Sequence, residues 1–176
     1  LSKALIETCD PDGSDALARA LVVAFASRSA GEEFVSMACA GDVERADAPA
    51  MLMRADTPAS KAFGHFARLN ALPFLWSRLH VLAEHVQKKC SRAFDADPFS
   101  AAVLPTAAAE EIIRNAQAVL DALVRDVHEY PSSLRSILRC VRDAVSHRFP
   151  GNERLVVAGL MFLRLVNPGI ATAADT

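Results

Sequence analysis

Apolar residues recur at helical spacing along most of this chain. Ala59, Ala62, Phe63 and Phe66 follow the i, i+3, i+4, i+7 pattern that places side chains on one face of an α-helix. Alternating β-branched segments are nearly absent, and no Asn-Gly or Asp-Gly turn is flanked by strand patterns. The pattern therefore predicts an all-α, multi-helix bundle, with residues 1–176 forming one domain.

Proline, glycine and capping residues divide the chain into the expected helices. Gly41 is expected to end one helix, Asn70-Ala71-Leu72-Pro73 to interrupt another, and Tyr130-Pro131 to separate two more. Segment 93–105 is expected to be a loop. Ser14 or Asp15 and Ser132 or Ser133 are the expected caps of two helices. The predicted helices cover 14–27, 31–40, 58–69, 73–86, 106–127, 132–148 and 153–166, with a further short one at about 2–8.

Three of these helices carry patterns that predict how they pack. The helix over 153–166 is apolar nearly all round, which predicts a central position, and Asn167-Pro168-Gly169 is expected to stop it. The helices predicted over 106–127 and 132–148 each carry an apolar stripe. The stripe of 106–127 consists of Ile113, Ala116, Leu120, Leu123 and Val127, and that of 132–148 consists of Leu134, Ile137, Leu138, Val141 and Val145.

Arg54 lies in a loop that ends at a well-defined helix start. Pro49 resists helix ahead of it, Thr57 suits the N-cap, and Pro58 falls at the first helical position, where its missing N–H costs nothing. A long cation is thereby placed on a loop whose far end is fixed. The local residues alone favour an ordinary solvated arginine.

Composition and charge exclude several classes of protein. Hydrophobic residues make up 52% of the chain and charged residues 23%, which is typical of a globular protein rather than a disordered one. The net charge of −2 gives no support for binding nucleic acid or an anionic membrane. The longest apolar runs are too short to span a bilayer. The absence of an initiator Met and the end at Thr176, just after an apolar pattern, indicate a fragment of a longer protein.

Cysteine and histidine residues form no recognisable metal or redox motif. The four cysteines are far apart and none has CxxC spacing, which favours a reduced, intracellular compartment over a disulfide framework. No HExxH motif or Gly-rich phosphate loop occurs. The sequence therefore predicts no metal or nucleotide site on this chain.

Basic residues gather in one part of the chain. Between Pro131 and Arg164 there are six arginines and two acids. Arg135, Arg139 and Arg142 share a face of the helix predicted there. A solvated helix face and a docking surface for an acidic partner both fit this pattern.

Arg164 is the hardest residue to place. It lies in an apolar segment, where a buried cation is costly unless its donors are satisfied. Its five N–H groups could bind the carbonyls of a nearby loop or of the helix end. A structural clamp and an arginine that extends to the surface remain alternatives.

Two motifs together resemble the Ras GTPase-activating proteins, especially neurofibromin-like members. The sequence 162–170 (FLRLVNPGI) is similar to their FLR…NPAI signature, and 52–61 (LMRADTPASK) is similar to their arginine-finger loop. Leu72-Pro73-Phe74-Leu75 and Ser146-His147-Arg148-Phe149-Pro150 resemble connecting segments of the same family. The resemblance covers nearly the whole chain.

The resemblance implies an all-helical domain that stimulates GTP hydrolysis by a Ras-family GTPase in its GTP form. Arg54 would be the arginine finger, supplied in trans, and Arg164 the second arginine that holds the finger loop from behind. The chain would not be an enzyme on a substrate of its own. The residues expected to contact the partner or shape the loop are Leu52, Met53, Ala55, Thr57, Leu163, Asn167 and Pro168, with Arg135, Arg139 and Arg142 as the basic docking face.

Further expectations follow from the same resemblance. GTP and Mg²⁺ would belong to the partner, so the chain would need no cofactor. It would be cytoplasmic and act at the inner face of membranes through the partner, without inserting into the membrane or binding nucleic acid. A non-catalytic Ras-binding scaffold on the same fold is the alternative.

The chain departs from the family pattern at several positions. Met53 replaces the usual Phe and predicts softer packing of the loop, while Gly169 predicts a looser turn after Asn167-Pro168. The family's domain continues beyond the NPAI motif, so the chain is expected to be a partial domain, truncated at its C-terminal end.

Overall fold

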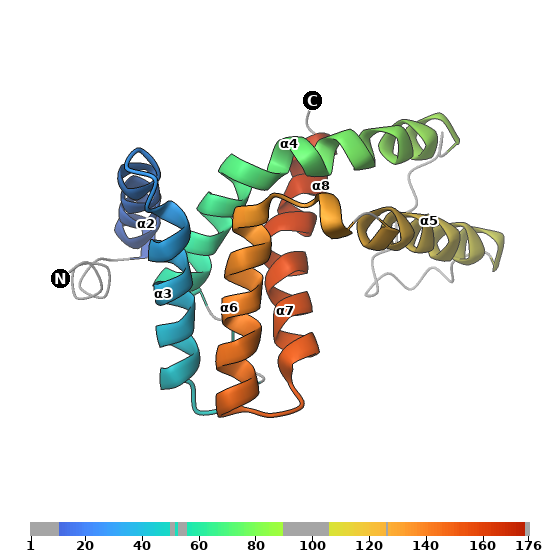
Figure 1. Cartoon of the computed structure of the whole chain (residues 1–176). Coiled ribbons are helices and arrows are strands. Elements are labelled where there is room, and N and C mark those ends of the chain that lie inside the picture. Colours follow the sequence, from blue (N-terminus) through green and yellow to red (C-terminus); the bar gives the residue numbers. More distant parts are fainter. Residues whose placement is uncertain (1–10, 50–51, 53–55, 90–105, 126, 175–176) are drawn as a thin grey trace.

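The computed structural model describes residues 11–49, 52, 56–89, 106–125 and 127–174, and all its regular elements are helical (Figure 1). No strand occurs among these residues, so the predicted all-α class is confirmed. The α-helices are α2 (Pro11–Ala26), α3 (Gly31–Arg45), α4 (Pro58–Lys89), α5 (Thr106–Arg125), α6 (Ser132–Arg148), α7 (Glu153–Met161) and α8 (Asn167–Ala174). A 3₁₀ turn (η2, Val127–Glu129) precedes α6, and a π-helical segment (η3, Phe162–Val166) joins α7 to α8.

Helix α6 lies between α3 and α7 (Figure 1). Helix α4 packs against α3 and, less extensively, against α6. Helix α2 covers the first part of α4, and η3 and α8 also pack on α4. Helix α5 lies beside the far part of α4, away from α3 (Figure 1). The loop that contains position 54 connects α3 to the start of α4.

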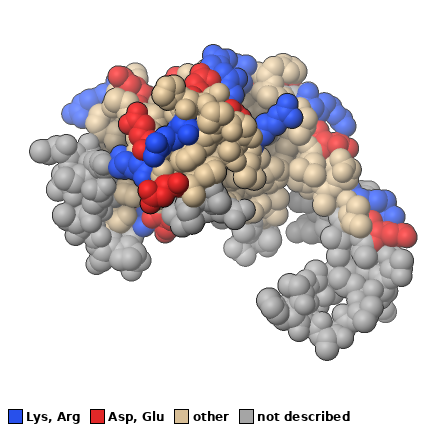
Figure 2. All heavy atoms as spheres, turned by 90° about the horizontal axis from the view of Figure 1, so that it is seen from below, with Lys and Arg blue, Asp and Glu red and all other residues tan. Residues whose placement is uncertain are grey.

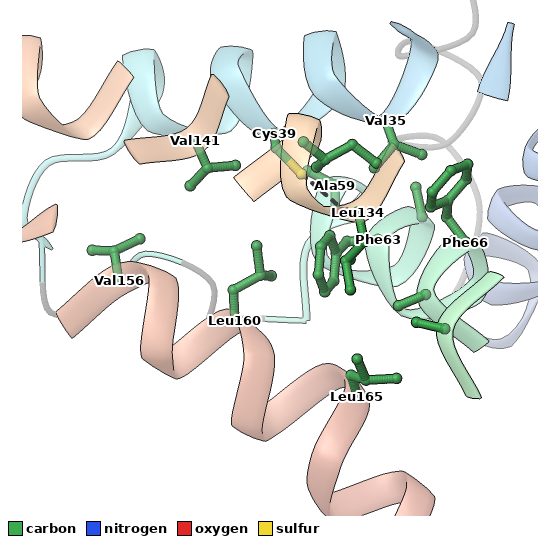
Figure 3. Close-up of a cluster of buried hydrophobic side chains, with 14 of the residues drawn as sticks. Val35, Cys39, Ala59, Phe63, Phe66, Leu134, Val141, Val156, Leu160 and Leu165 are labelled. Carbon is green, nitrogen blue, oxygen red and sulfur yellow. Dashed lines mark hydrogen bonds between the residues drawn. The ribbon is translucent and has the colours of Figure 1, made fainter. Parts of the chain in front are cut away.

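The core lies where α3, α4, α6, α7 and η3 meet (Figure 3). Phe63, Leu134, Ile137, Leu160 and Leu165 are each less than 2% exposed. The predicted faces of α4 and α6 supply a large share of this core, because their apolar residues recur at helical spacing. Truncating one such side chain to alanine typically costs about 2–5 kcal/mol.

Pro73 does not interrupt the helix, contrary to the sequence prediction. Helix α4 is continuous from Pro58 to Lys89 with Pro73 inside it, and its direction changes along its length in Figure 1. A proline inside a helix removes one backbone hydrogen bond and favours a bend. Ala71 and Leu75, on either side of it, are buried in the core. Their packing holds both halves in place, so tertiary contacts outweigh the local preference.

Several predicted helix ends are also wrong. Helix α3 runs through Gly41 to Arg45, and α2 begins at Pro11, so Ser14 lies within the helix rather than at its cap. Pro131 occupies the N-cap of α6, with no side-chain cap from Ser132 or Ser133. The expected segments at 2–8 and 93–105 lie outside the described residues.

The apolar stripe of α5 is mostly exposed. Leu123 is 8% exposed, but Ile113 is more than half exposed, and Leu120 and Ala116 are also on the surface. Val127, predicted to belong to the same helix, lies beyond the end of α5 in η2 and is also more than half exposed. The periodicity therefore predicted the helix and its face, but not the burial of that face.

The sequence predicted that the helix would end at Asn167-Pro168-Gly169, but the chain remains helical there. It passes from α7 through η3 directly into α8. Val156 and Leu160 are buried, whereas Leu155 is 58% exposed and Leu163 41%, so the segment buries one side only and is not the central helix expected.

Gly169 is buried within α8 and allows this helix to approach α4 closely, so it does not loosen a turn. A Cβ atom at this position would lie 2.7 Å from Leu75 Cδ2 and 3.3 Å from Leu72 Cδ1. Leu75 is 1% exposed, so it has little room to move.

We expect Gly169→Ala to destabilise the fold, with Gly159→Ala as the matched control. The clash at 169 costs about 1–3 kcal/mol, more than the ~0.5–1 kcal/mol that alanine gains over glycine in a helix. A Cβ at Gly159 would meet no atom within 4 Å, so the control should gain stability. Chemical denaturation of both variants measures the difference, and equal stabilisation would show that α8 can move away from α4.

Candidate functional site

Thr57 caps α4 as predicted and fixes where the preceding loop ends. The Ser60 N–H donates to Thr57 Oγ1 (3.2 Å), and the Lys61 N–H donates to the Thr57 carbonyl (3.0 Å). The Thr57 hydroxyl in turn donates to Asp42 Oδ2 of α3 (2.9 Å). The cap therefore ties the end of the loop to both helices that the loop connects.

The π-helical segment η3 explains why an arginine is tolerated in an apolar helix. The Asn167 N–H donates to the Phe162 carbonyl, five residues back. Val156 and Leu160 are buried four residues apart, and the next buried residues are Leu165 and Val166, so the spacing to the next core position is five residues. In a regular α-helix the next core-facing position would be 164. The wider turn gives the core position to Leu165 and leaves Arg164 beside it.

Arg164 reaches across to the loop that precedes α4. Its Nη1 lies 3.1 Å from Asp56 Oδ1, and its side chain is 20% exposed. This contact favours the clamp over the arginine that extends to the surface. One acceptor is the Asp56 carboxylate, two residues after Arg54, which the sequence did not predict. The backbone carbonyls that it did predict as acceptors stay a prediction.

Lys61 is a second cation on the same carboxylate, and sequence reasoning missed it. Its Nζ lies 3.6 Å from Asp56 Oδ2 and donates to Ser14 Oγ of α2 at 3.1 Å. The Lys61 side chain is 7% exposed, whereas that of Asp56 is 67% exposed. The signal in the sequence was the spacing of Asp56 and Lys61 across the first turn of a capped helix.

Two hollows flank this junction. A cavity of about 210 Å³ is lined by both ends of the Arg164–Asp56 pair together with Lys61, Gly64 and Pro168. An apolar groove of about 550 Å³ lies between the loop and α7, with Pro49 and Leu52 on one side and Phe162 and Leu163 on the other. Leu163 lines both hollows, so η3 separates a charged cavity from an apolar groove.

The structure brings together part of the predicted site. Leu52 is 5% exposed, Leu163 is 41% exposed, and Pro168 lines the charged cavity. Asn167 is exposed, with its backbone N–H engaged in η3. The predicted residues Met53, Arg54 and Ala55 lie outside the described residues.

The three predicted docking arginines lie on α6. Arg135, Arg139 and Arg142 are all exposed, opposite the buried residues of that helix. Arg142 forms an ion pair with Asp143 at 2.7 Å, which offsets part of its charge. The face of the molecule seen from below carries basic and acidic groups side by side (Figure 2). The contacts described for these arginines do not join them to the Asp56–Arg164 junction.

Other functional groups give little indication of chemistry on this chain. Within the described ranges, His, Cys, Asp and Glu form no group of three that could hold a metal ion. Burial raises the pKa of the Cys39 thiol well above its usual range, so this cysteine is not a reactive nucleophile. Of the helices that the structure describes, none combines the length and apolarity needed to cross a membrane.

The sequence is similar to a curated human protein over most of its length. No family model matches the sequence. Over 177 aligned residues the chain is 27% identical to the human protein named RasGAP-activating-like protein 1, and the alignment covers 89% of this chain. The chain spans 22% of the length of that protein. The chain is therefore distantly similar to a RasGAP-like protein along most of its length.

Proposed function

We propose that this chain is a GTPase-activating domain that supplies Arg54 in trans to a Ras-family GTPase in its GTP form. The name of the human relative supports a Ras-regulating role in general, and the two sequence motifs support the finer assignment. The chain needs no cofactor in this role, because GTP and Mg²⁺ are bound by the partner. It acts at the inner face of membranes, where the partner resides.

The contact between Arg164 and Asp56 is the observation that carries this proposal. It joins the two stretches that resemble the family, although they are 108 residues apart. A finger is effective only if its loop is fixed before the partner arrives, since reordering during the reaction would cost free energy. The Thr57 cap and the Arg164–Asp56 pair fix the C-terminal end of the loop in this way.

The mechanism follows from the demands of phosphoryl transfer. Charge on the transferred γ-phosphoryl group is stabilised by cations held in the right place, and little covalent help is needed. Arg54 supplies its guanidinium to that charge. Leu52 packs the loop against the domain, and Leu163 offers an apolar contact to the switch surface of the partner.

Single-turnover GTP hydrolysis by a panel of Ras, Rap and R-Ras proteins tests the function. We expect the chain to accelerate hydrolysis by at least one of them, with a maximal rate that saturates as its concentration rises. Binding to the GTP form without acceleration would instead identify a non-catalytic scaffold. Absence of both binding and acceleration across the panel would contradict the proposal.

The exposed arginines of α6 are expected to act in association rather than in chemistry. Reversing Arg135 and Arg139 to glutamate should weaken association with the GTPase by about 10-fold or more, mainly through a slower association rate. The effect should shrink as salt is added. Reversing Arg114 and Arg125 on α5 changes the net charge by the same amount and is the control, so an equal effect of both double changes would show that only net charge matters.

A further inference from the structure

Asp56 is held by two cations that come from different parts of the fold. Arg164 approaches Oδ1 from η3 at 3.1 Å, and Lys61 approaches Oδ2 from the first turns of α4 at 3.6 Å. Asp56 lies between position 54 and the Thr57 cap. Any displacement of the finger loop at this end must therefore break contacts with both cations or move them.

Lys61 is an unusual residue to find buried in this position. Lysine is rarely buried unless its charge is compensated, because removing an ammonium group from water is costly. Here the ammonium group donates to Ser14 Oγ at 3.1 Å, and Ser14 is itself 7% exposed. The ammonium group is therefore fixed by α2 on one side and faces the Asp56 carboxylate on the other.

The pairing of Lys61 with Asp56 adds little to the free energy of unfolding. Asp56 is 67% exposed, and an ion pair with such an exposed partner contributes little to folding. The carboxylate is attached to the loop rather than to the core. Its two contacts consequently affect the geometry of the loop much more than the free energy of unfolding.

We propose that Lys61 and Asp56 are positioning residues for the finger, with Lys61 as the fixed cation that orients the Asp56 carboxylate. This inference rests on the proposed function. It adds a second attachment of the loop, independent of Arg164, that reaches through Ser14 to α2. Neither residue touches the reacting phosphate; both act through the shape of the loop.

Two variants of the complete chain test the inference. Lys61→Met keeps the length and apolar stem of the side chain and removes the charge, and Asp56→Asn removes the charge of the acceptor. We expect each to lower the maximal single-turnover rate about 10- to 100-fold while the half-saturating concentration of the chain changes less than twofold. The double variant should lose no more than Asp56→Asn alone, because that change already removes the one interaction that Lys61→Met removes, together with the contact to Arg164.

The control is Arg114→Met. Arg114 pairs with Glu110 at 3.8 Å, but both side chains are more than 60% exposed and both residues belong to α5. Its removal should leave the maximal rate unchanged. A purely structural role for Lys61 would instead lower the midpoint of thermal unfolding, and the folded molecules would keep the wild-type maximal rate; that result would overturn the inference.

A readout independent of GTP hydrolysis separates this inference from the proposed function. Cleavage after Arg54 by an arginine-specific protease reports on the order of the loop. Lys61→Met leaves the residues beside that bond unchanged, whereas Asp56→Asn changes the second residue after it, so each rate is divided by that of an unfolded peptide with the same sequence. Faster cleavage in Lys61→Met and Asp56→Asn than in wild type and Arg114→Met would support the positioning role even if no tested GTPase responds. Equal cleavage rates in all four proteins would overturn it, whereas a wild-type chain that fails to stimulate any GTPase would overturn the proposed function alone.

Discussion

Arg54→Ala is expected to lower the stimulated rate of GTP hydrolysis by about 10³- to 10⁵-fold, the contribution typical of arginine fingers. The finger supplies charge where the transition state develops it, and alanine supplies none. Binding should change little, because the guanidinium group acts mainly on the transition state rather than on the ground state. Single-turnover hydrolysis measures the rate, and association with the GTPase loaded with a non-hydrolysable GTP analogue measures binding.

Arg54→Lys is the informative companion to this variant. Lysine keeps the charge but lacks the planar fork of guanidinium donors, so it should recover only part of the lost rate. Arg28→Ala, which removes an arginine between α2 and α3, controls for the loss of one positive charge. If Arg54→Ala retained wild-type stimulation, another group would have to supply the catalytic charge.

Arg164→Ala is expected to lower the maximal stimulated rate by about 100-fold through loss of loop order. Of its two contacts among the described residues, Asp56 would then keep the longer one, to Lys61. The free energy of unfolding should fall by less than about 1 kcal/mol through loss of this pair, since the carboxylate is largely exposed. Hydrogen exchange across residues 50–57, measured beside single-turnover hydrolysis, should show faster exchange in the variant.

Arg114→Ala provides the comparison for Arg164→Ala. Arg114 pairs with Glu110 on α5 at 3.8 Å, and both side chains are more than 60% exposed. Its loss should alter neither the rate nor the exchange of the loop. Unchanged exchange in Arg164→Ala would show that the cap and Lys61 hold the loop without Arg164.

Local chemistry made some parts of the structure predictable from sequence. The Thr57-Pro58 start of α4 follows from hydrogen bonds within a few residues, and the structure has that cap. The buried faces of α4 and α6 follow from helical periodicity. These features depend on neighbours in the sequence, and no distant contact was needed to predict them.

Helix ends were predicted poorly because distant contacts decided them. Pro73 and Gly41 are local helix breakers, yet both lie inside helices whose flanking residues are packed in the core. Likewise, the apolar stripe of α5 does not reveal which of its residues meet a neighbour. Periodicity describes one helix, whereas burial depends on the arrangement of several.

The candidate site was predictable in part. Arg164 was singled out because an arginine in an apolar segment needs an acceptor, but the acceptor, Asp56, is 108 residues away in the sequence. Lys61 was missed because a lysine near a helix start is ordinarily solvated. The role of Arg54 stays a prediction that rests on the family resemblance.

The π-helical segment makes the spacing of residues in this part of the chain as important as their identity. Deleting one residue between Phe162 and Leu165 would leave Leu165 four positions after Leu160, the spacing of a regular helix, so Leu165 and Gly169 could keep their places in the fold. The extra residue of the wider turn is what allows Arg164 to lie beside a buried leucine. A homologous chain that is one residue shorter here should therefore keep the packing of this segment but lose the clamp on the finger loop.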